Sequence, residues 1–202
     1  PPIDIALGAD WRWDGLPGSY TGHAIAMAPN TLLIGAPSDA TVGGNTYLTT
    51  DFDRGSHTLE ETAIRVRTTE PDAYLGSAVL GVEDSEGEAY LIVGMLNSSA
   101  VAIMARPLMD TEFGVSRTGD PNVVQGTRAG DCGSELASGQ PFSSGLTGVL
   151  VSCPRTIDGA QLISVDSLRD TRDASLEDVS LRVGWGIDDS DDVGLAIDLV
   201  DV

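Results

Sequence analysis

Residues 31–48 read TLLIGAPSDATVGGNTYL, and this stretch decides the fold of the chain. A short apolar run stops at Gly35-Ala36-Pro37, a polar turn contains Gly43-Gly44, and the chain resumes with the alternating Thr46-Tyr47-Leu48. Short apolar or alternating runs bounded by glycine and proline predict two strands joined by a turn. Just upstream, Gly22–Ala26 opens with a glycine and predicts a third strand in the same unit.

The same order of segments returns further along the chain. A glycine heads a short apolar strand at four places, 54, 57 and 61 residues apart: Gly22, Gly76, Gly133 and Gly194. The second and third units continue, like the first, with an apolar run and a further strand. A strand-rich unit repeated at this period predicts stacked supersecondary units, and it favours propeller blades over solenoids.

Each unit is expected to end with a fourth, outer strand. Residues 63–67, AIRVR, alternate as such a strand should, and their counterparts are residues 122–125 and 179–183. Arg65 and Arg67 would face away from the core, which is consistent with charge that protects a sheet edge. Four strands to a unit is the number that a propeller blade requires.

These segments predict an all-β protein that forms a single partial β-propeller over residues 1–202. Four-stranded antiparallel blades are expected at residues 21–70, 75–127 and 132–186. Two edge strands remain, at residues 3–13 and 194–202, and they would share a further blade that lacks its middle strands. The ring is therefore expected to be incomplete with this chain alone, and to be completed either by the rest of a longer protein or by another chain. Residues 51–61 are interpreted as a polar turn, and residues 166–178 as a loop.

The repeated residues resemble the FG-GAP repeat, the blade unit of integrin-alpha-type β-propellers. The likeness rests on the glycine-opened strand at 22–26, on Leu-Leu-Ile-Gly-Ala-Pro at 32–37, and on the glycine turn that follows. It covers nearly the whole chain, although Gly-Ala-Pro stands intact only in the first unit. The aromatic residue that this family places before the opening glycine is replaced in each unit, by Thr21, Leu75, Cys132 and Val193.

The resemblance implies calcium as a cofactor, because many FG-GAP repeats hold it in an acidic loop between the first two strands. In the second unit, Asp84 and Glu86 stand at the third and fifth ligand positions of this loop. Val82 and Tyr90 replace the first and last ligands, which favours a solvated turn over a calcium site. The fourth unit offers two further candidates where its loop would begin, Asp198 and Asp201.

Two cysteines, Cys132 and Cys153, stand at equivalent distances from the turn between the first two strands of the third unit. If those strands pair as a hairpin centred near Phe142, the cysteines face each other at the short Cα separation that a disulfide needs. A disulfide is favoured over two buried free thiols. Because disulfides persist in oxidising compartments, we expect a secreted or cell-surface protein.

Charge narrows the range of partners. The chain has 31 acidic residues against 11 basic ones, all of them arginine, and a net charge of −20. This balance argues against nucleic acid and anionic membranes as partners, because phosphate contacts need Lys and Arg. No apolar run approaches the roughly 20 residues that a membrane-spanning helix needs. The partner is therefore expected to be a protein or carbohydrate ligand at the cell surface.

Catalytic motifs are missing from the sequence. There is no G-x-S-x-G and no H-E-x-x-H, and the two histidines are His23 and His57. Trp11 and Trp13 share one face of the first strand, and the repeated position of Trp13, nine residues before Gly22, favours packing between blades over a sugar-stacking role. An enzyme is not expected.

The leading expectation for function is a non-catalytic extracellular recognition or adhesion module, because loops on a rigid scaffold commonly carry binding. One alternative is a structural subunit of a filament or surface assembly, completed by strand addition from a neighbouring chain. Another is the accessory propeller of a secreted hydrolase.

Overall fold

The structure, a computed structural model, describes residues 10–28, 30–38, 43–50, 52–68, 70–98, 100–105, 112–115, 123–125, 136–139, 146–153, 159–170 and 181–184. Within these residues the chain is mostly strand, and its helices are the short α2 (Leu59–Thr62), η1 (Leu96–Ser98) and α3 (Val165–Asp170). The predicted all-β class is confirmed. None of the described helices combines the length and the apolar character that a bilayer span requires.

The first unit forms the first sheet, in the order β10-β6-β4-β3-β2. Its antiparallel strands are β2 (Ile25–Ala28), β3 (Thr31–Ala36), β4 (Asn45–Thr49) and β6 (Ile64–Thr68). The fifth strand, β10 (Glu112–Val115), comes from later in the chain and runs parallel to β6.

Two further sheets are each antiparallel and four-stranded. The second has the order β11-β9-β8-β7, built from β7 (Leu75–Glu83), β8 (Ala89–Met95), β9 (Ala100–Ala105) and β11 (Val123–Gln125). The third has the order β12-β13-β14-β15, built from β12 (Leu136–Gly139), β13 (Gly148–Cys153), β14 (Gly159–Ser164) and β15 (Leu181–Gly184). The predicted outer strands are therefore present as β6, β11 and β15.

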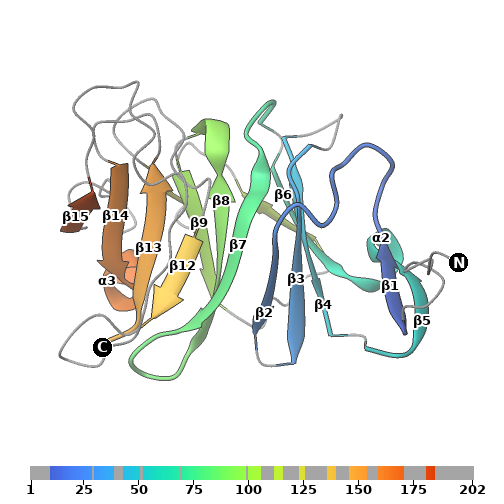
Figure 1. The fold of residues 1–202 in the computed structure, drawn as a ribbon, viewed down its shortest axis with the longest axis horizontal. Coiled ribbons are helices and arrows are strands. Elements are labelled where there is room, and N and C mark those ends of the chain that lie inside the picture. The colour runs from blue at the N-terminus through green and yellow to red at the C-terminus, as the bar shows by residue number, and fades with distance from the viewer. Residues whose placement is uncertain are drawn as a thin grey trace, which may run out of the picture.

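The three sheets follow one another in chain order, and a separate parallel pair, β1 (Trp11–Asp14) with β5 (Gly55–Thr58), lies beyond the first sheet (Figure 1). Side chains that alternate along each strand supply three cores, one of them on the outer face of the first sheet. Leu33 of β3 packs with Leu91 and Val93 of β8 between the first and second sheets. Ile92 points the other way and packs with Val151 between the second and third sheets. Because β8 is apolar on both faces, it is buried along most of its length.

Glycines let the first and second sheets approach closely. A Cβ atom placed on Gly35 would lie 2.1 Å from the backbone oxygen of Gly76, and one placed on Gly81 would lie 2.5 Å from the Cβ of Ala28. No side chain fits at such distances. The glycine of the Gly-Ala-Pro motif therefore sets the spacing between successive sheets.

Two segments differ from their predicted conformation. Residues 51–61 hold β5 and the start of α2, whose Leu59 is fully buried against the outer face of the first sheet. The predicted loop at 166–178 begins as α3, whose Val165 and Leu168 are buried between the second and third sheets. Two apolar residues three positions apart are enough to anchor one turn of helix once a core is present to receive them.

The outer edge of the first sheet also differs from the prediction. Arg65 and Arg67 do not protect a free edge, because β10 pairs with β6 along it. Both guanidinium groups bind the carboxylate of Glu112, Arg67 at 2.5 Å. The hydrogen bond from Arg65, together with both arginine charges, holds the pKa of Glu112 below its usual range.

Candidate binding groove and the predicted site residues

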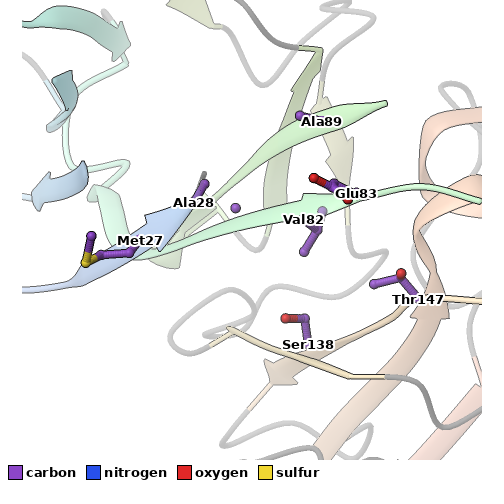
Figure 2. A pocket seen from close by; sticks show the side chains of 8 residues that line it. Met27, Ala28, Val82, Glu83, Ala89, Ser138 and Thr147 are labelled. Carbon is purple, nitrogen blue, oxygen red and sulfur yellow. The ribbon is translucent and has the colours of Figure 1, made fainter. Parts of the chain in front are cut away.

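The first strands of the three sheets, β2, β7 and β12, are neighbours, and two hollows lie along them. We call these hollows together the three-strand groove. One hollow, about 350 Å³, is lined by residues that include Met27, Val82, Glu83, Ser138 and Thr147 (Figure 2). The other, about 300 Å³, is lined by residues that include His23, Ile25, Ser77 and Leu136. Each hollow thus has walls from all three sheets.

The larger hollow combines a carboxylate, two hydroxyl groups and apolar walls. Figure 2 shows Glu83 on one side of it, with Ser138 and Thr147 on the other. Volumes near 300 Å³ suit a small ligand or a few residues of a longer one, and a few polar groups among small apolar ones can fix its orientation. The carboxylate of Glu83 gives this part of the groove a preference for a cationic group.

Two turns at the entrance to β2 and β7 have the same geometry. Tyr20 and Tyr74 have φ angles of 53° and 52°, and the glycines two residues later, Gly22 and Gly76, have φ angles of 88° and 91°. In both turns the tyrosine carbonyl accepts a hydrogen bond from the third residue on, at 3.0 Å from His23 and 3.1 Å from Ser77. The first two of the four predicted repeat openings therefore share one backbone conformation, whereas Gly133 and Gly194 lie outside the described residues.

The tyrosines of these turns are exposed, 70 % for Tyr20 and 37 % for Tyr74. A left-handed conformation costs a non-glycine residue roughly 1–2 kcal/mol, so its recurrence at equivalent positions is a defined feature of the fold. Gly22 donates a hydrogen bond to Gly35, which itself lies against Gly76, so the turns are neighbours. The pattern Tyr-x-Gly at 20–22 and 74–76 was the sequence signal for these residues, and it was missed because an aromatic was sought directly before the glycine.

Asp84, the first predicted calcium ligand, lies in the turn between β7 and β8 with its side chain fully buried. Its Oδ1 accepts hydrogen bonds from the backbone N–H groups of Glu86 and Glu88, both at 2.9 Å. Its Oδ2 accepts one from Nη1 of Arg169 in α3, at 2.5 Å. Burial raises the pKa of Asp84, but the bonds from Glu88, Glu86 and Arg169 outweigh it and leave the pKa below its usual value.

This arrangement does not fit a calcium site. Three donors and a guanidinium charge already surround the Asp84 carboxylate, and a cation there would be repelled by Arg169. Glu86 donates only its backbone N–H to Asp84, and Glu86 itself is exposed. Among the described residues no three acidic, histidine or cysteine side chains are close enough to hold a metal ion. Asp198 and Asp201 lie outside the described residues.

Cys153, at the end of β13, is buried and disulfide-bonded. Its predicted partner, Cys132, lies outside the described residues. The strands that were expected to bring the two together do pair as an antiparallel hairpin. Its register, with Leu136 opposite Val151 and Gly139 opposite Gly148, differs by two residues from the predicted one, which set Cys132 directly opposite Cys153.

Trp13 packs as predicted. It lies against the apolar outer face of the first sheet, edge-on to Phe52 and stacked on His57, with both pairs of ring centroids 6.2 Å apart. Trp185, its counterpart in the repeat, lies outside the described residues.

When the sequence was compared with models of known protein families and with curated proteins, none of them matched. The resemblance to the FG-GAP repeat therefore rests on the residues quoted above.

Proposed function

We propose that the three sheets are successive blades of a partial FG-GAP-like β-propeller, and that this propeller is a non-catalytic recognition module. The strand order of each sheet and the matching turns at Tyr20 and Tyr74 support the blade assignment. In this arrangement the three-strand groove lies along the innermost strands of the blades, β2, β7 and β12.

The observation that carries the recognition function is the pair of exposed tyrosines held in equivalent conformations in the turns that lead into β2 and β7, two of the strands of this groove. Tyrosine provides a large contact area at a low cost in side-chain entropy, which is why it is enriched in binding surfaces. The ligand that suits the groove is an extended segment of a surface protein that carries a basic residue. Glu83 would pair with that residue, and the net charge of −20 would attract it.

A secreted or cell-surface location belongs to this proposal. The disulfide at Cys153 supports it, because such bonds persist outside the reducing cytosol.

The test is binding of the whole chain to an array of surface-protein peptides, with a glycan array in parallel. We expect basic extended peptides to bind, and the double variant Tyr20→Ala/Tyr74→Ala to bind at least about tenfold more weakly, a loss of about 1.4 kcal/mol. Glu83→Gln should weaken the basic peptides selectively, while Glu61→Gln, which removes another exposed carboxylate, should not. If the double variant binds the peptides as tightly as the unaltered chain, the tyrosines are not part of the binding site. If the chain binds glycans and no peptides, the proposed ligand class is wrong.

A second function, a structural subunit completed by a neighbouring chain, is favoured by one observation. In the described part of the first sheet β2 is an end strand, and its Ile25 and Met27 are 63 % and 71 % exposed. Val79, at the position of the second unit equivalent to Ile25, is buried by the first sheet. An added strand or sheet would cover Ile25 and Met27 in the same way. Sedimentation should then show concentration-dependent assembly that Met27→Glu abolishes, and a monomer at all concentrations would exclude this function.

A further inference from the structure

The two tryptophans of β1 have different environments, although they were expected to share one role. Trp13 is packed against the first sheet, whereas Trp11 is 42 % exposed. An exposed indole gains little from burial, so its rigid placement needs another explanation.

Trp11 is held in a fixed orientation by its polar atom. Its Nε1–H donates a hydrogen bond to the carbonyl of Phe52 at 2.6 Å, so the edge of the ring is anchored while part of its surface stays in solvent. Phe52 is itself placed by its edge-on contact with Trp13, which is stacked on His57. An exposed aromatic ring that is already ordered can bind a ligand with little loss of side-chain entropy.

Hydrogen-bonding groups border the ring of Trp11. The guanidinium carbon of Arg54 lies over the ring, 5.9 Å from its centroid, and Arg54 also pairs with Asp10 at 3.6 Å. Both of these charged side chains are more than half exposed, so their ion pair contributes little to stability and can rearrange. Arg54 supplies several donors and Asp10 two acceptor oxygens, a combination that suits the hydroxyl groups of a sugar.

We infer that Trp11, with Arg54 and Asp10 beside it, forms a second binding site whose ligand is a neutral β-linked oligosaccharide. The pyranose rings of such a chain present flat C–H faces that stack on an aromatic ring, and their equatorial hydroxyls project sideways toward the polar groups. Anionic glycans are disfavoured because the protein carries a net charge of −20.

This site is separate from the three-strand groove. The β1–β5 pair lies beyond the outer face of the first sheet, away from β7 and β12 (Figure 1). The inference therefore does not depend on the proposed function, and each can fail without the other.

The test is calorimetric titration of the whole chain with cellohexaose and chitohexaose. We expect at least one of them to bind, and Trp11→Ala to lower the association constant at least about tenfold. Trp11→Phe should retain most of the affinity, because it keeps an aromatic face. Circular dichroism and the thermal midpoint verify that both variants fold. The double variant Tyr20→Ala/Tyr74→Ala is the matched control, and it should bind the sugar as the unaltered chain does.

Three results would overturn the inference. The first is that neither hexasaccharide binds the unaltered chain at millimolar concentration. The second is that Trp11→Ala binds as well as the unaltered chain. The third is that affinity falls in the tyrosine double variant and not in Trp11→Ala, which would move the sugar to the three-strand groove. The peptide array reports on the groove independently.

Discussion

Arg169 of α3 and Asp84 of the β7–β8 turn form an ion pair at 2.5 Å that joins the third sheet to the second, 85 residues apart in sequence. Asp84 is buried, and Arg169 also pairs with Asp170 at 2.7 Å. Hydrogen bonds to Asp170, Tyr90 and Asp84 raise the pKa of Arg169 above its usual value in spite of partial burial. The turn is further tied to α3 by the N–H of Ser85, which donates to Asp166 at 3.2 Å.

Replacing Asp84 by alanine should destabilise the fold by about 3 kcal/mol, because two backbone N–H groups and a guanidinium lose their common acceptor. Asp84→Asn should cost less, since its carbonyl can still accept from Glu86 and Glu88. Urea unfolding at neutral pH measures both. Glu86→Gln is the control and should stay within about 0.5 kcal/mol, because only the backbone of Glu86 takes part. An Asp84→Ala variant as stable as the control would show that the ion pair does not join the sheets.

The stability of the fold should decrease in acid because the carboxylate of Asp84 becomes protonated. The pKa of Asp84 is lower in the folded chain than the ordinary value of 3.8, so the folded state favours the charged form. Its contribution is complete above about pH 4–5 and is lost as the pH falls through the lower, folded pKa. Urea midpoints measured from pH 7 to pH 2.5 should therefore decline more steeply for the unaltered chain than for Asp84→Asn. The carboxylate of Glu112 adds to the decline in both proteins, so the difference between them isolates Asp84. If the urea midpoints of the unaltered chain and of Asp84→Asn decline equally with falling pH, Asp84 is not the source of the acid sensitivity.

Calcium should not bind at Asp84. The measurement is the change in thermal midpoint between excess calcium and a chelator. This change should be the same for the unaltered chain and for Asp84→Asn, because Arg169 already neutralises the Asp84 carboxylate. If calcium stabilises the chain, the effect should disappear in the double variant Asp198→Asn/Asp201→Asn. A calcium effect that Asp84→Asn removes would restore the loop of the second unit as a metal site.

Gly35→Ala should destabilise the protein by about 2 kcal/mol or more, because the new methyl group meets the backbone of Gly76, which cannot move without separating two sheets. Gly114→Ala is the matched control: it also lies in a strand, and a Cβ there meets nothing within 4 Å. Urea unfolding of both variants is the measurement. Similar stabilities would mean that the close approach of the sheets is not required.

Local sequence patterns predicted most of the strands, because apolar runs and their bounding glycines are short-range features. The outer strands β6 and β15 were found from alternation and from their place in the repeat. The Asp84–Arg169 pair and the pairing of β10 with β6 were not found, since each depends on residues distant in sequence. β10 has four residues and no strong alternation, and only the edge that receives it defines it as a strand. The exposed tyrosines were visible as a repeated Tyr-x-Gly and were overlooked.

The position of β10 also has a consequence for how the protein forms during synthesis. The first sheet receives its last strand from the segment between β9 and β11. That sheet can therefore be completed only after the chain has been synthesised as far as Val115 and this segment has left the ribosome. Until then β6 offers an unpaired edge, and the charges of Arg65 and Arg67 discourage other nascent chains from joining it. The first two repeats therefore reach their final form together.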